Sequence, residues 1–358
     1  MRTLTLRELN RATLARQLLL RRHPLSVTQA IERTAGLQAQ WPPSPYLGLW
    51  SRVDGFRPDD LVRAIARRHV VKATLMRTTL HLVSAADYLA YGGIYRGSRI
   101  RDLQRQLEAF GEEADFAKEG ERLATCAGER ARTRPELLAL LGLPRLRIED
   151  RAPWLLWYGL AAHAGLVNGP ESSVWRSHTA GGTYVPARTW LGADAASGDA
   201  AAAHLVKSYL AAFGPASRPD IAQWTGMARS VVDQGLAGLE LRRFRDEQER
   251  ELYDLPRAPL PSAETAAPAR LLPRFDNLVL SHDDRRRVLS DEYRAAVIER
   301  GEVRATFLVD GFVAGIWALE DGRVRLQPFA PLPRAVRWEV AAEAERLEAF
   351  VRASGRVP

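Results

Sequence analysis

The chain of 358 residues contains one cysteine, three lysines and no long apolar run. The single cysteine, Cys126, excludes an internal disulfide and a zinc site built from several cysteines. No stretch approaches the roughly 18 apolar residues that cross a bilayer, and the N-terminal segment reads as a charged amphipathic helix without a signal-peptide core. We therefore expect a cytoplasmic protein that has no membrane partner.

Several catalytic signatures are also missing. The sequence has no G-x-S-x-G elbow, no Walker A loop, no G-x-G-x-x-G after a strand and no H-E-x-x-H. Its seven histidines are scattered without the spacing of metal ligands. We therefore expect neither a metal nor a cofactor.

The charge of the chain is unevenly distributed. The composition is that of a folded protein, with 46% hydrophobic and 26% charged residues and a net charge of +8. Residues 1–100 hold 16 Arg and Lys against 6 Asp and Glu, so the excess is N-terminal. Clustered cations favour a polyanion partner for this third, although a solvated basic face would give the same count.

The clearest structural pattern lies at residues 200–256. A helix ends at Gly214-Pro215, Ser217 caps a second helix with Pro219 in its first turn, and a third helix carries apolar residues at helical spacing. The following LRRFRDEQERELYDL reads as two strands around a polar turn. Three helices and a hairpin in this order predict a winged helix-turn-helix.

A similar order of elements occurs twice more. Helices are expected near residues 5–20, 26–37 and 58–68, before a hairpin that turns near Met76-Arg77. Residues 115–190 supply three more helices and a long hairpin that turns at Gly181-Gly182. In the last part, strands are expected within 271–280, 304–320 and 323–329, and a helix over 334–351.

We therefore expect an α+β fold with three tandem winged helix-turn-helix motifs and a C-terminal mixed α/β part. The predicted boundaries are 1–110, 111–195, 196–258 and 268–358. The second and third motifs could serve equally as protein-packing modules or as DNA readers.

Two glutamines stand out in the basic N-terminal third. Gln38 and Gln40 flank Ala39 in a run that otherwise looks like core, and Trp41-Pro42-Pro43 follows at once. The residue before a proline is pushed toward extended geometry, and residues two apart in an extended chain project to the same side. We expect both amides to face one cleft, with Ala39 packed inward.

Three stretches in this order carry a specific resemblance: LQAQWPPSPYLGLWSR, LMRTTLHLVSAADY and LLPRFDNLVLSHDDRRRVL. Together they resemble the AlkZ-like winged-helix DNA glycosylases, over nearly the whole chain. The resemblance implies a C-shaped body around a DNA channel and a catalytic Gln-aliphatic-Gln motif, which Gln38 and Gln40 match. Ala39 departs from the pattern only in bulk. The resemblance also implies excision of N7-alkylated purines, including antibiotic-derived adducts and interstrand crosslinks.

The chemistry of such a pair limits its substrate. A glutamine does not ionise, but it can orient water and sugar, which suffices when the leaving base already carries a positive charge. The expected enzyme is thus a monofunctional, monomeric DNA glycosylase of repair or self-resistance, without lyase activity. It would act on double-stranded DNA with alkylated purines and associate with the nucleoid when bound. The alternative is a winged-helix transcriptional regulator without catalysis, which an abasic-site assay would distinguish.

Further DNA contacts are expected around this pair. Arg77, Thr78 and His81 lie at the first predicted wing, although His81 also fits a partly buried strand residue. The hairpin at 172–190 is a second candidate. Asp276 and Asn277, ahead of a basic run that begins at Arg285, could line the channel or merely cap a turn, with the arginines as a solvated face.

Overall fold

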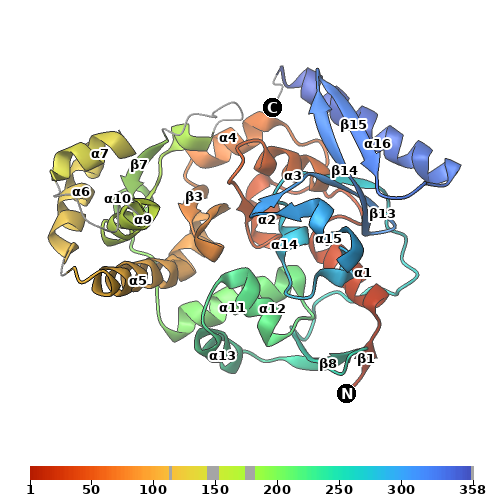
Figure 1. Cartoon of the computed structure of the whole chain (residues 1–358), viewed down its shortest axis with the longest axis horizontal. Helices are drawn as coiled ribbons and strands as arrows, with labels where there is room; N and C mark the ends of the chain where they lie inside the picture. Colours follow the sequence, from red (N-terminus) through yellow and green to blue (C-terminus); the bar gives the residue numbers. More distant parts are fainter. Residues whose placement is uncertain (113–114, 143–152, 174–181, 356–358) are drawn as a thin grey trace.

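The structure is a computed structural model that describes residues 1–112, 115–142, 153–173 and 182–355. It is a mixed α+β fold, as the sequence predicts, with several small sheets. Helices α6, α7 and α9 lie at one end of the molecule and the C-terminal sheet with α16 at the other, with α2 and β3 between them (Figure 1). Among the described residues, no helix is long and apolar enough to cross a membrane.

The N-terminal helices form where the sequence predicts them, although they end earlier. Thr5 and Ser26 each close a capping box at the start of a helix. A helix that was not expected begins after the two prolines, with Pro45 in its first turn. The elements are β1 (Thr3–Leu4), α1 (Leu6–Arg16), α2 (Val27–Arg33), β2 (Leu37–Gln38), α3 (Ser44–Arg52) and α4 (Pro58–Ala66).

The first hairpin is also confirmed. It consists of β3 (Val70–Thr74) and β4 (Leu80–Ser84), joined through the 3-10 turn η1 (Met76–Thr78). The long helix α5 (Ala85–Ala109) follows and ends beside the predicted boundary at 110. The hairpin belongs to a six-stranded sheet of order β2-β4-β3-β6-β7-β5, so one sheet joins the first and second predicted modules.

The second module holds the predicted helices. Its expected hairpin differs from prediction, since β7 pairs with β6 and residues 170–173 form a 3-10 turn. The middle of that hairpin, 174–181, lies outside the described residues. The elements are α6 (Ala117–Glu129), β5 (Arg132–Thr133), α7 (Arg134–Leu141), α9 (Pro153–His163), β6 (Leu166–Asn168), η2 (Pro170–Ser173), β7 (Thr183–Pro186) and α10 (Ala187–Leu191).

Residues 199–254 show the predicted order of three helices and a hairpin. Ser217 caps the second helix through a capping box with Asp220, and Gly214 ends the first. Strand β1 adds to the hairpin in parallel, which ties the N-terminus to this module. The elements are α11 (Asp199–Phe213), α12 (Arg218–Thr225), α13 (Arg229–Ala237), β8 (Arg242–Asp246) and β9 (Glu251–Asp254).

The C-terminal part is a four-stranded sheet, order β10-β13-β14-β15, against α16. One expectation is wrong: the strand predicted over 271–280 ends at Leu272, because Asp276 caps a short helix there. The elements are β10 (Arg270–Leu272), α14 (Asn277–Leu280), η3 (Arg285–Arg287), α15 (Asp291–Val297), β11 (Ile298–Glu299), β12 (Glu302–Val303), β13 (Thr306–Val309), β14 (Phe312–Glu320), β15 (Arg323–Pro328) and α16 (Arg334–Ala353).

Candidate functional site

The glutamine segment is placed by a sharp reversal of the chain. After α2, Ala35 and Gly36 both take left-handed φ values, 56° and 92°, and the chain enters β2. A Cβ on Gly36 would lie 2.9 Å from Cγ1 of Val83 and 3.0 Å from the carbonyl oxygen of Leu82. Glycine is therefore required here both for its backbone angle and for the close approach to β4.

The β2–β4 ladder then sets the position of each glutamine. Gln38 stands opposite His81, and the Ala39 N–H donates to the Leu80 carbonyl at 2.7 Å. Ala39 is 3% exposed and belongs to the core, which confirms its predicted packing role. Gln38 is 5% exposed whereas Gln40 is exposed, so the two amides differ in their access to solvent. That they face one cleft stays a prediction.

Both amide oxygens accept hydrogen bonds from segment 77–80, which runs from the turn after β3 to the first residue of β4. The Gln38 Oε1 accepts from Nη2 of Arg77 at 2.9 Å, and the Gln40 Oε1 accepts from the Leu80 N–H at 3.3 Å. Within the described ranges, neither NH2 group has a hydrogen-bond partner, which leaves two amide donors for a ligand. Segment 77–80 therefore fixes the orientation of both amides.

Arg77 occupies a strained position at the tip of that turn. Its φ is 53° and that of Thr78 is 57°, a region that costs a non-glycine residue about 1–3 kcal/mol. The guanidinium also donates to the Trp224 carbonyl at 2.7 Å, at the end of α12. Burial lowers the pKa of Arg77 to about 10, and the charge of Arg285 contributes to this shift. The side chain stays cationic at neutral pH.

His81 is the buried cross-strand neighbour of Gln38. It is 0% exposed, and its Nδ1 lies 3.1 Å from the Thr79 carbonyl oxygen, so Nδ1 carries the proton. Burial and the charge of Arg77 lower the pKa of His81 to about 3, which keeps the ring neutral. Its Nε2 has no partner among the described residues. His81 is a fully buried strand histidine in this structure.

Helix α14 is hydrogen-bonded to the residue that precedes β2. Asp276 caps this helix by accepting from the Leu278 N–H at 3.0 Å, and it forms two hydrogen bonds to Arg52 at 2.8 and 2.9 Å. The amide of Asn277 donates to the Gly36 carbonyl at 2.9 Å. The expected cap at Asp276 is confirmed. A direct DNA contact stays a prediction for three residues that are all buried, His81, Asp276 and Asn277.

The basic run after α14 is not a solvated face, in contrast to expectation. Arg287 is buried and donates to the Pro215 carbonyl at 3.0 Å, while Arg286 pairs with Asp284. Arg285 is half-buried, and burial lowers its pKa. In the described part of the chain, Arg285 forms no ion pair. Its positive charge contributes to the lowered pKa of Arg77.

Sequence reasoning missed Arg52, which fixes α14 through its pair with Asp276. Its signal was an arginine inside the apolar run PYLGLWSRV, since a buried guanidinium needs an acidic partner. No three His, Cys, Asp or Glu side chains of the described residues gather closely enough to hold a metal ion.

Comparison with known proteins identifies the family of the chain. The family model "DNA glycosylase AlkZ-like" matches residues 31–350. An interstrand DNA cross-link repair glycosylase of Streptomyces sahachiroi is 28% identical over 95% of this chain and 94% of its own length. The solved structure of the Streptomyces sahachiroi DNA glycosylase AlkZ superposes with a TM-score of 0.79, at 23% identity, over 99% of both chains. The chain therefore belongs to the AlkZ-like DNA glycosylases, enzymes that cleave N-glycosyl bonds in DNA.

Proposed function

We propose that this protein is a monofunctional glycosylase that hydrolyses the N-glycosidic bond of cationic N7-alkylated purines in duplex DNA. The observation that carries this proposal is the pair of neutral amides, Gln38 and Gln40, whose oxygens are both held by segment 77–80. Its relative's description as a cross-link repair glycosylase favours bulky adducts and interstrand crosslinks among the substrates.

The amide pair suits a reaction that needs placement rather than proton transfer. A base alkylated at N7 carries a positive charge and leaves as a neutral molecule, so no acid has to protonate it. The free NH2 groups of Gln38 and Gln40 can hold the attacking water and the deoxyribose in register. Arg77 fixes the Gln38 amide through a charge-assisted hydrogen bond, so little reorganisation is needed when the lesion arrives.

The proposed absence of lyase activity rests on the position of the nearest lysine. A lyase needs an amine nucleophile, and burial lowers the pKa of Lys72 to about 8. However, Lys72 pairs with Leu82 in the sheet, one position away from the pairing of Ala73 with His81. Because side chains alternate along a strand, Lys72 projects from the face opposite to Gln38 and His81. Its amine donates instead to the Ser172 carbonyl at 2.7 Å.

The proposal extends to the architecture. We regard 1–110, 111–195 and 196–258 as three winged helix-turn-helix motifs in a C-shaped monomer, with residues 268–358 as the C-terminal part. The helix and hairpin order of residues 199–254 supports the third motif. The basic N-terminal third supplies the cations that would meet the DNA backbone, among them Arg77.

Substitution of the amides tests the proposal. Gln38→Ala and Gln40→Ala should each slow release of N7-methylguanine roughly 10- to 100-fold, since each removes one positioning group. DNA affinity should stay within a few-fold. Abasic sites revealed by hot alkali would report base release, and no strand should break before the alkali step. If both variants release the base at the parent rate, the pair is not catalytic.

Arg77 offers a second test, because its side chain is bonded within the protein. Arg77→Leu removes the contact that orients Gln38, so excision by bound enzyme should fall about tenfold. The slope of log affinity against log salt should change by at most about one phosphate contact. Arg33→Leu, an exposed cation of the same basic third, is the matched control and should leave the excision rate unchanged. An unaltered rate and an unaltered slope in Arg77→Leu would remove Arg77 from the site.

A further inference from the structure

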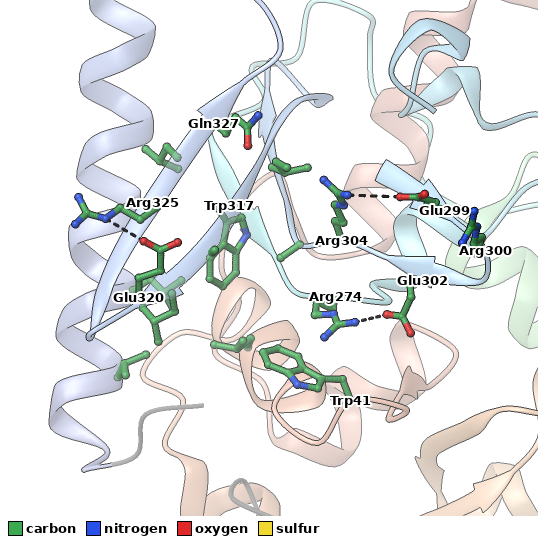
Figure 2. A pocket seen from close by; sticks show the side chains of 18 residues that line it. Trp41, Arg274, Glu299, Arg300, Glu302, Arg304, Trp317, Glu320, Arg325 and Gln327 are labelled. Atoms are coloured by element: carbon green, nitrogen blue, oxygen red, sulfur yellow. Dashed lines mark hydrogen bonds and ion pairs between the residues drawn. The ribbon is translucent and has the colours of Figure 1, made fainter. Parts of the chain in front are cut away.

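The glutamine pair lies outside the cavity that Trp41 lines. This cavity, of about 760 Å³, lies between α3, the C-terminal sheet and α16 (Figure 2). Its walls include Trp317, and ion pairs such as that of Arg304 with Glu299 stand at its edge (Figure 2). Neither glutamine nor any residue of segment 77–80 lines it. The amides depend instead on segment 77–80 and on the elements that pack against that segment.

The turn η1 packs against the end of α12, a helix of the third predicted module. The Arg77 guanidinium donates to the Trp224 carbonyl at 2.7 Å, and the Tyr95 hydroxyl of α5 donates to the Thr225 carbonyl at 3.1 Å. Carbonyls in the last turn of a helix have no partner within it and lie at the negative end of its dipole. In the described part of the chain Arg77 forms no ion pair, and its hydrogen-bond partners are this helix end and Gln38.

Gly226 allows the helix end to approach the turn closely. It follows α12 with φ 70° and ψ 19°, the left-handed conformation with which many helices end. A Cβ on Gly226 would lie 2.9 Å from the backbone nitrogen of Arg77 and 3.0 Å from its Cα. The two backbones are therefore in close contact, and a side chain at position 226 would have to displace one of them.

A glycine that merely ends a helix does not show this approach. Gly192 ends α10 with φ 83°, in the same left-handed region, yet a Cβ there would meet nothing within 4 Å. The backbone angle alone accounts for the glycine at position 192. At position 226 both the angle and the contact with Arg77 require glycine.

We propose that Gly226 is a positioning residue for the excision reaction, and that the third module takes part in the reaction through it. The close approach places the carbonyls of α12 where they hold the Arg77 guanidinium, and Arg77 in turn fixes the Gln38 amide. Segment 77–80 also donates to the Gln40 amide, so a displacement of the turn would reach both glutamines. The proposal rests on the proposed glycosylase function and adds a residue to it.

Gly226→Ala should slow base release by the bound enzyme about tenfold or more, because the new Cβ moves the turn or the helix end and a misplacement of about 1 Å can cost about 10²-fold in rate. Single-turnover release of N7-methylguanine at saturating protein measures this effect. The substitution adds no charge, so DNA affinity from fluorescence anisotropy should stay within about threefold of the parent. Gly192→Ala, the matched control, imposes the same backbone strain without the contact and should release the base at the parent rate.

Two further variants separate the contact from backbone strain and from misfolding. Gly226→Asn suits the left-handed angle better than alanine does, yet it should be at least as slow because it also carries a Cβ. Tyr95→Phe removes the hydroxyl that holds the Thr225 carbonyl and adds no atom, so release should slow about threefold. Thermal melting followed by circular dichroism shows which variants fold, and Tyr95→Phe decides the matter if the Gly226 variants do not.

A double variant with Arg77→Leu tests whether Gly226 acts through Arg77. Substitutions that act on one series of contacts are not independent, so the double variant should release the base within about threefold of the slower single variant. A rate reduced by the full product of the two single effects would contradict action through Arg77.

The outcomes distinguish this proposal from the proposed function. A folded Gly226→Ala that releases the base at the parent rate, or a Gly192→Ala that is slowed as much, would overturn the positioning role and leave the glycosylase standing. The same holds for an unaltered rate in Tyr95→Phe if neither Gly226 variant folds. A parent that binds the duplex and releases no base would instead refute the proposed function, and the positioning role with it.

Discussion

Release of N7-methylguanine should exceed release of uracil or 8-oxoguanine by at least about 10²–10⁴-fold at equal DNA occupancy. General acid-base help contributes that much to typical enzymes, and two glutamines supply none of it. A neutral base leaves as an anion unless an acid assists, and each missing tenfold in rate corresponds to about 1.4 kcal/mol of barrier. The imidazole of His81, which pairs with Gln38 across the strands, is buried, and its pKa is lowered to about 3.

The same reasoning predicts the pH dependence of the chemical step. Between about pH 6 and 9 the amides do not ionise, His81 stays neutral because its pKa of about 3 lies below this window, and Arg77 stays charged because its pKa of about 10 lies above it. Single-turnover rates on matched duplexes should be flat across this range. Comparable rates on the neutral lesions, or a bell-shaped profile, would mean that an acid or base other than these residues does the chemistry.

Asp276→Ala should destabilise the protein by about 3–5 kcal/mol. The change leaves the Arg52 guanidinium, with 0% of its side chain exposed, without its carboxylate, and it removes the cap of α14. Chemical denaturation followed by circular dichroism would measure the loss. Because α14 holds the Gly36 carbonyl through Asn277, excision should also fall in the fraction that remains folded.

Two further variants separate stability from activity. Asp102→Ala breaks a surface ion pair with Arg105, of the kind that contributes about 0–1 kcal/mol, and serves as the control. Asn277→Ala loses a single hydrogen bond to the segment that leads into Gln38. We expect this variant to lose excision activity while its free energy of unfolding changes little. A loss of less than about 1 kcal/mol in the free energy of unfolding of Asp276→Ala would contradict the structural role of the Arg52–Asp276 ion pair.

Local signals allowed most helices to be predicted from the sequence. Thr5, Ser26 and Ser217 cap helices through side-chain contacts three residues away, and Gly214 with Pro215 stops α11, so neighbouring residues alone decide these ends. The single sheet that joins β3 with β6 was not predictable. Its register depends on pairing Lys72 with Asn168, which no turn between them specifies.

Some features of the candidate site could likewise be predicted from the sequence, and others could not. The extended conformation at Gln38 and the packing of Ala39 follow from local pattern, since Pro42 and Pro43 exclude a continuing helix. The partners of the amides could not be predicted in this way, because Arg77 and Leu80 lie about forty residues later in the chain. Arg77 also takes a left-handed backbone angle that its residue type does not indicate. The burial of Asp276 and Arg287 likewise needed the tertiary packing that surrounds them.

The most direct test of the central claim is to measure the free base that the protein releases from DNA. A duplex with one N7-methylguanine would be incubated with the parent and with the Gln38→Ala, Gln40→Ala double variant, at concentrations that saturate the DNA. We predict that mass spectrometry will detect free N7-methylguanine from the parent, with an intact abasic strand, and far less from the double variant. Tight DNA binding by the parent without any released base would contradict the claim and indicate a winged-helix DNA-binding protein without catalysis.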